Sequence, residues 1–149
     1  MQITPLEAFD IVSSIELTNQ LVQTLQETAD KYRLWQDPPG NGLSHYTRRY
    51  YTCPFFDHKP GGCLLPPEVK PYGCLGFNPQ IEKVSQEGLC HSDQDLLEKR
   101  DQFNPTWENE ENQKIKEKFN INWDKKPIPI ALLELIKKEI LYNVSGVLV

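Results

Sequence analysis

Apolar residues in the first 35 positions recur at the spacing of two amphipathic helices. The first helix begins with a start signal in which Thr4 caps, Pro5 takes the first helical position and Glu7 completes a capping box. Thr18 caps the second helix. The predicted buried face of the first helix is Leu6, Phe9, Val12 and Ile15, and that of the second is Leu21, Leu25, Ala29 and Tyr32.

Helical patterns return in residues 92–149. Ser92 is expected to cap a short helix. Asn104 and Pro105 begin another, over 105–119, in which acidic residues come early and lysines late, an order that suits the helix dipole. Such a charge run is typical of a solvated face. The last helix, over 130–142, is predicted to be the most buried because of its apolar residues Leu132, Leu133, Leu135, Ile136, Ile140 and Leu141.

Residues 36–91 differ in kind, since they contain eight of the twelve prolines and seven of the eight glycines. Proline removes backbone donors and glycine opens left-handed conformations, so neither helices nor central strands should be long here. So long a loop fits a compact domain only if a cross-link replaces regular structure. The sequence therefore predicts one mostly α domain over 1–149. Helices at 1–35 and 92–149 would surround an irregular Cys-, Pro- and Gly-rich metal-binding loop.

Charge and composition exclude several classes of function. The net charge of −5 and pI near 5.2 argue against nonspecific nucleic-acid binding. No apolar stretch is long enough for a membrane span, and no secretory leader is recognisable, so we expect a cytoplasmic protein with no membrane partner. Glycine-rich nucleotide loops and a Gly-x-Ser-x-Gly elbow are absent from the sequence. Nothing in the sequence identifies a protein partner.

The four cysteines, Cys53, Cys63, Cys74 and Cys90, all lie in the central segment. Thiolates are soft ligands that favour zinc and iron–sulfur clusters, and four of them complete a tetrahedral site. Nine, ten and fifteen residues stand between successive cysteines, and there is no Cys-x-x-Cys pair. From spacing alone, three interpretations stay open: a metal site, buried free thiols and a redox disulfide. His58 and His91 are additional candidate ligands.

The central segment resembles the YkgJ-like cysteine-cluster family, described as zinc- or iron-chelating domains. The resemblance is carried by Cys53-Pro-Phe-Phe-Asp57, by Gly62-Cys63-Leu-Leu and by Val69-Lys-Pro71-Tyr-Gly-Cys74. Lysine stands where the family has arginine in the last of these. The resemblance implies that zinc or iron, including an iron–sulfur cluster, is held by Cys53, Cys63, Cys74 and Cys90.

The sequence departs from that family at its beginning. Family members start with a Cys-x-x-Cys-Cys cluster, followed closely by a segment similar to residues 3–8 of this chain. Here that cluster would fall upstream of Met1. We therefore expect the site as written to be incomplete, with one four-cysteine centre at most.

Metal binding is the leading functional interpretation, and two alternatives belong to other classes. A thiol-based redox or sensor protein would need an activated thiolate, and Cys53 near Arg48, Arg49 and His58 is the best candidate. A helical interaction module without metal would use the acidic helix over 105–119. The sequence has no His-x-x-x-His metallohydrolase signature, and an enzyme is not expected.

Overall fold

A computed structural model describes residues 2–36, 51–57, 62–75, 99, 102 and 105–145. The predicted cap at Ser92 lies outside these ranges. The described chain is mostly helical, as predicted. Its helices are α1 (Pro5–Ser14), α2 (Asn19–Lys31), α3 (Tyr72–Leu75), α5 (Pro105–Phe119) and α6 (Ile128–Ser145), with 3-10 turns η1 (Leu34–Gln36) and η2 (Pro67–Val69). Its strands are β1 (Gln2–Ile3), β2 (Phe56–Asp57), β3 (Gly62–Cys63) and β4 (Lys126–Pro127).

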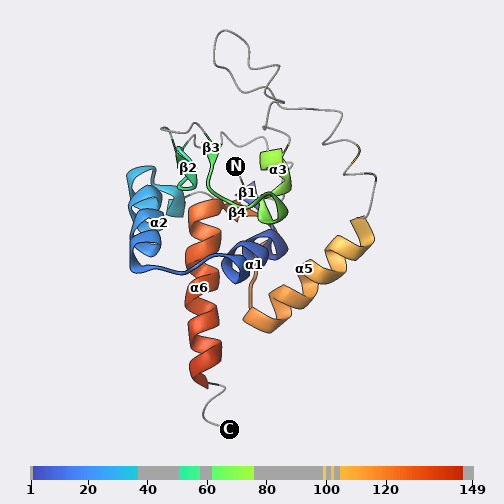
Figure 1. The fold of residues 1–149 in the computed structure, drawn as a ribbon. Helices are drawn as coiled ribbons and strands as arrows, with labels where there is room; N and C mark the ends of the chain where they lie inside the picture. The colour runs from blue at the N-terminus through green and yellow to red at the C-terminus, as the bar shows by residue number, and fades with distance from the viewer. Residues whose placement is uncertain are drawn as a thin grey trace.

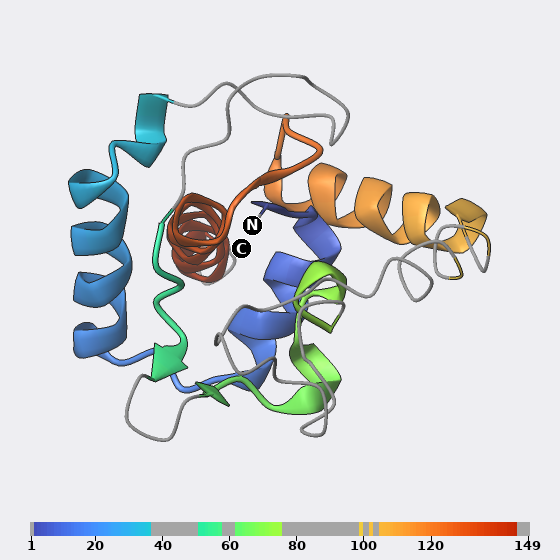
Figure 2. The same ribbon diagram turned by 90° about the horizontal axis from the view of Figure 1, so that it is seen from above.

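Helix α6 is the central element of the fold. Both α1 and α2 pack against it, and α1 in turn contacts α5 (Figure 1). Viewed along α6, the segment 51–57 passes between α2 and α6 (Figure 2). The predicted burial of the last helix is confirmed for Leu132, Leu135 and Ile136, whereas Leu133 is half-buried. The side chains of Ile140 and Leu141 lie outside the described part of the chain. The three buried residues of α6 share one core with Ala8, Ile11 and Leu25.

Both predicted helix starts in the N-terminal part are confirmed. Thr4 Oγ1 accepts the Glu7 N–H at 3.3 Å while the Glu7 carboxylate accepts the Thr4 N–H at 2.8 Å, which is a complete capping box. Thr18 Oγ1 accepts the Leu21 N–H at 3.1 Å at the start of α2. These contacts satisfy backbone donors that have no partner inside the helix.

The predicted buried face of α1 is confirmed only in part. Val12 is buried as predicted, and Phe9 and Ile15 are half-buried but pack against the core. Leu6 is also half-buried, whereas the fully buried Ala8 and Ile11 were not predicted. The predicted face is rotated because α1 contacts α6 on one side and α5 on another, and the small Ala8 lies fully buried in the core. Phe9 instead meets Phe119 of α5, with ring centroids 5.8 Å apart.

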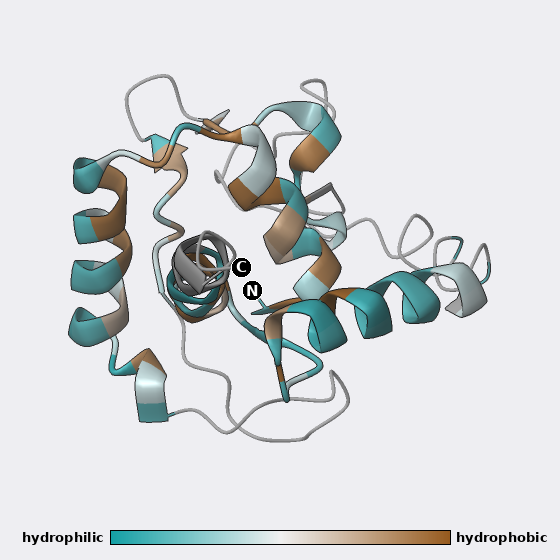
Figure 3. Ribbon diagram, turned by 90° about the horizontal axis from the view of Figure 1, so that it is seen from below, coloured by the Kyte–Doolittle hydropathy of each residue, from teal (hydrophilic) through white to brown (hydrophobic). Residues whose placement is uncertain are grey.

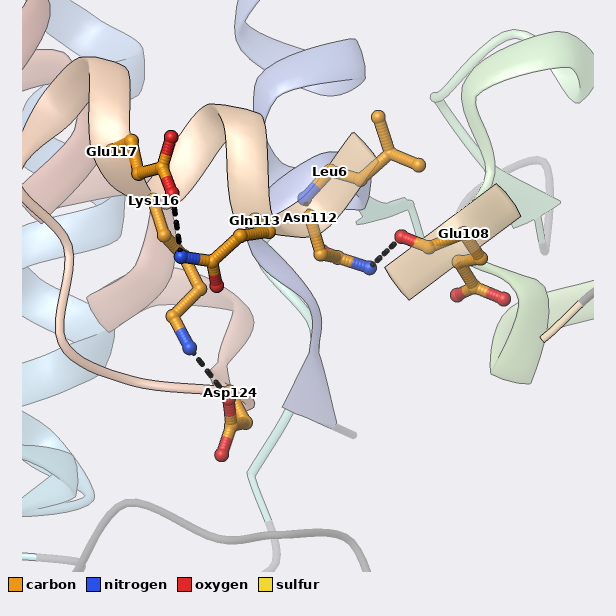
Figure 4. A network of polar contacts seen from close by, with 7 residues as sticks. All are labelled: Leu6, Glu108, Asn112, Gln113, Lys116, Glu117 and Asp124. Atoms are coloured by element: carbon orange, nitrogen blue, oxygen red, sulfur yellow. Dashed lines mark hydrogen bonds and ion pairs between the residues drawn. The ribbon is translucent and has the colours of Figure 1, made fainter. Parts of the chain in front are cut away.

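A polar contact links α5 to the first turn of α1 (Figure 4). Asn112 Oδ1 accepts the Leu6 N–H at 2.9 Å, and Asn112 Nδ2 donates to the Glu108 carbonyl at 2.9 Å. Helix α5 ends where Asn120 adopts a positive φ of 50° and the Ile121 N–H bonds to the Lys116 carbonyl at 2.8 Å. The outer faces of α2 and α5 are hydrophilic, as predicted for the charge run in α5 (Figure 3).

Two short antiparallel ladders complete the described structure. Strand β1 pairs with β4, so the start of the chain lies beside the start of α6. Strand β2 pairs with β3, with Phe56 opposite Cys63. All described elements between residues 51 and 75 are short, as the proline and glycine content predicted. Among the described residues, no helix combines the length and apolarity that crossing a bilayer requires.

Candidate metal centre

The structure describes three of the four predicted cysteine ligands. Cys53 lies in the segment 51–57, Cys63 in β3 and Cys74 in α3, and all three are free and half-buried. All pack against the edge of the main core. The elements that carry them lie near one end of α6 (Figure 1). Cys90, His58 and His91 lie outside the described residues.

The segment that carries Cys53 is fixed to the helices on both sides. The hydroxyl of the half-buried Tyr51 accepts the N–H of Ile128, the first residue of α6, at 3.0 Å. The neighbouring Thr52 hydroxyl bonds with the Tyr32 hydroxyl at the end of α2, at 3.2 Å. These contacts place Cys53 between α2 and α6.

Cys53 and Cys63 are brought near each other by a turn and a short ladder. The Cys53 carbonyl accepts the Phe56 N–H at 3.0 Å, which turns the chain into β2. Phe56 then pairs with Cys63, and the Leu64 N–H bonds to the Phe55 carbonyl at 2.8 Å. The buried Phe55 ring anchors this arrangement in the core.

Cys74 is positioned by the short helix α3. Its N–H donates to the carbonyl of the buried Pro71 at 2.7 Å. The N–H of Tyr72, the first residue of α3, donates to Glu7 Oε1 at 2.8 Å. Helix α3 is therefore attached to α1 as well as to the turn that precedes it.

The three thiols are within electrostatic range of one another. Burial, together with the neighbouring charges of Cys53, Cys63 and Glu7, raises the pKa of the Cys74 thiol to about 12. Burial also raises the pKa of the Cys53 thiol, with Cys63 adding to the effect. Burial likewise raises the pKa of the Tyr51 hydroxyl, and the charges of Cys53 and Cys74 add to that shift. Cys53 and Cys74 are therefore neutral thiols near pH 7 in the absence of metal.

The metal-free protein is expected to lose stability in alkali. The Cys74 thiol keeps its proton to a higher pH when folded than when unfolded, so the unfolded chain releases that proton first as the pH rises. The contribution of the Cys74 thiol to the free energy of unfolding is complete below about pH 9. It falls by roughly 2 kcal/mol toward pH 12, a value reduced because the thiol is partly exposed. Urea unfolding across this range measures the slope. Cys74→Ser should flatten it, and an unchanged slope would assign the loss to other groups.

The thiols of Cys53, Cys63 and Cys74 are donors that suit a soft metal, but their arrangement in this structure is not that of a metal site. Within the described ranges, no set of three or more His, Cys, Asp or Glu side chains stands ready to hold a metal ion. Zinc–sulfur bonds are about 2.3 Å long, so a bound ion would draw the sulfurs closer. An open groove of about 410 Å³, lined by Thr24, Thr28, Lys31 and Thr52 among others, also borders Cys53.

Sequence reasoning missed two residues at this place, Glu7 and Tyr51. Tyr51 could have been suspected, because in an extended segment it shares a face with Cys53 two residues later. The hydrogen bond from the Tyr72 N–H to Glu7 could not be read from the sequence, because the capping box already explained why a glutamate stands at position 7.

Comparisons with protein-family models, curated proteins and solved structures found no match to this chain. The resemblance of residues 53–79 to the YkgJ-like family therefore stays a prediction.

Proposed function

We propose that this protein binds zinc or iron, as a single ion or as an iron–sulfur cluster, through the thiolates of Cys53, Cys63 and Cys74. Cys90 is the proposed fourth ligand, and His58 and His91 are additional candidates. The proposal places the protein in the cytoplasm, where reducing conditions keep thiols free.

The observation that carries this proposal is that three free, half-buried cysteines from three separate chain segments pack against the same core, within electrostatic range of one another. Each segment is fixed by its own contacts: Tyr51 to α6, Phe56 to β3, and Tyr72 to α1. Isolated buried thiols need no such convergence, since each can pack separately as a small apolar side chain.

The electrostatics favour metal binding over an activated thiol. A nucleophilic cysteine needs a lowered pKa, whereas burial raises the pKa of Cys53 and Cys74. A bound cation supplies the positive charge that lets buried thiols exist as thiolates. Binding then releases the thiol protons, so metal affinity should rise with pH.

Metal content tests the proposal directly. Protein purified without oxygen and loaded with excess zinc, or with iron(II) with and without inorganic sulfide, should retain about one equivalent of zinc or one iron centre after desalting. Elemental analysis measures the metal, and visible absorption distinguishes an iron–sulfur cluster from zinc. Protein that emerges from both loadings without stoichiometric metal would overturn the proposal.

A further inference from the structure

Glu7 connects two elements that are far apart in the sequence. Its Oε2 accepts the Thr4 N–H at 2.8 Å, which closes the capping box of α1. Its Oε1 accepts the N–H of Tyr72, the first residue of α3, also at 2.8 Å. Cys74 follows two residues later in the same helix. One carboxylate therefore serves the starts of α1 and α3 together.

Helix α3 needs this external contact more than a long helix would. It has only four residues, and the first N–H groups of any helix lack partners inside it. Hydrogen bonds to a charged carboxylate are about twice as strong as neutral ones. The Tyr72 N–H therefore anchors α3 to α1, and the position of Cys74 depends on that anchor.

We infer that Glu7 is a positioning residue for the proposed metal centre, holding Cys74 in place through the Tyr72 N–H. The inference rests on the proposed metal-binding function. Glu7 does not need to touch the metal, because both of its oxygens bond to backbone N–H groups. Partners of this kind, outside the ligands themselves, typically change metal affinity by about 10- to 100-fold when removed.

The alternative is that Glu7 matters only because it stabilises α1. Two variants isolate that effect. Thr4→Ala removes the oxygen that accepts the Glu7 N–H but leaves the carboxylate in place. Asn112→Ala removes the side chain by which α5 caps the Leu6 N–H. Both weaken the start of α1 without removing the contact to Tyr72.

Metal affinity, measured by competition with a chromophoric zinc chelator, separates the two explanations. Glu7→Ala should weaken zinc binding about 10- to 100-fold. Glu7→Gln keeps one accepting oxygen and should fall between Glu7→Ala and the wild type. Thr4→Ala and Asn112→Ala should stay within about threefold of the wild type, since neither loses the carboxylate. Equal weakening by Thr4→Ala and Glu7→Ala would overturn the inference, as would an unchanged affinity in Glu7→Ala.

Amide hydrogen exchange of the metal-free protein tests the contact itself. The Tyr72 amide should exchange at least about tenfold faster in Glu7→Ala, because it loses a charge-assisted bond. The Leu21 amide, which Thr18 caps in α2, is the internal reference and should not change. Unchanged Tyr72 exchange would overturn the inference whatever the metal result. A wild type that binds neither zinc nor iron but shows the exchange difference would refute the proposed function and leave the contact established.

Discussion

Cys74→Ser is expected to lower bound metal and the free energy of unfolding together, but only when metal is present. Without metal, serine replaces a half-buried neutral thiol, and the change in stability should stay within about 1 kcal/mol. With metal, the wild type gains stability by mass action, about 3 kcal/mol at a hundredfold excess over the dissociation constant. Most of that gain should disappear in the variant.

The measurement is urea unfolding of both proteins with and without zinc, beside the metal content of each. Lys114→Ala is the control. Lys114 is exposed on α5, and its described ion pair is with Glu111 of the same helix. That variant should retain wild-type metal and wild-type stability. If Cys74→Ser were equally destabilised in both conditions, its effect would come from packing, and Cys74 would not be a ligand.

Leu132→Ala should destabilise the protein by about 2–5 kcal/mol, whether or not metal is bound. Leu132 is fully buried in α6, within the core that α1, α2 and α6 share. Removing the Leu132 side chain leaves a cavity, and the helices cannot readily move to fill it because α1 and α2 both pack against α6. Urea or thermal unfolding followed by circular dichroism gives the value.

The matched control is Leu17→Ala in the connection between α1 and α2. Leu17 is 40% exposed, so the same substitution should cost less than about 1 kcal/mol there. If the two variants lost equal stability, α6 would not be the centre of a packed core, and the scaffold proposed for the cysteines would need revision.

Features encoded in short stretches of sequence were predictable. The cap, the proline and the glutamate at 4–7 act within one helical turn, so their pattern sufficed to place the start of α1. The apolar residues of 130–142 likewise marked α6 as buried. The complete buried face of α1 was not predictable, because α1 contacts both α5 and α6 and local spacing does not show which residues those contacts bury; Val12 was predicted, but Ala8 and Ile11 were not.

The cysteines of the candidate site could be named from the sequence, but the contacts that hold them could not. The cysteines alone left a metal site, buried thiols and a disulfide open, and metal binding stays a prediction that rests on the resemblance. The structure places Cys53, Cys63 and Cys74 within electrostatic range of one another. The contacts that hold them join Tyr51 to Ile128 and Glu7 to Tyr72 across the length of the chain. No local pattern encodes such pairs. The β1–β4 ladder was missed for the same reason, since two-residue strands have no periodicity to detect.

The bond between Tyr51 and Ile128 has a consequence for the order of events during synthesis. The amide that bonds to the Tyr51 hydroxyl lies 77 residues further along the chain, so it emerges from the ribosome long after the cysteines at 53, 63 and 74. Strand β1 likewise cannot pair until β4 has been synthesised. A nascent chain therefore exposes these cysteines before their scaffold exists. Under the proposed function, uptake of metal would follow the release of the C-terminal helix rather than accompany translation of residues 53–74.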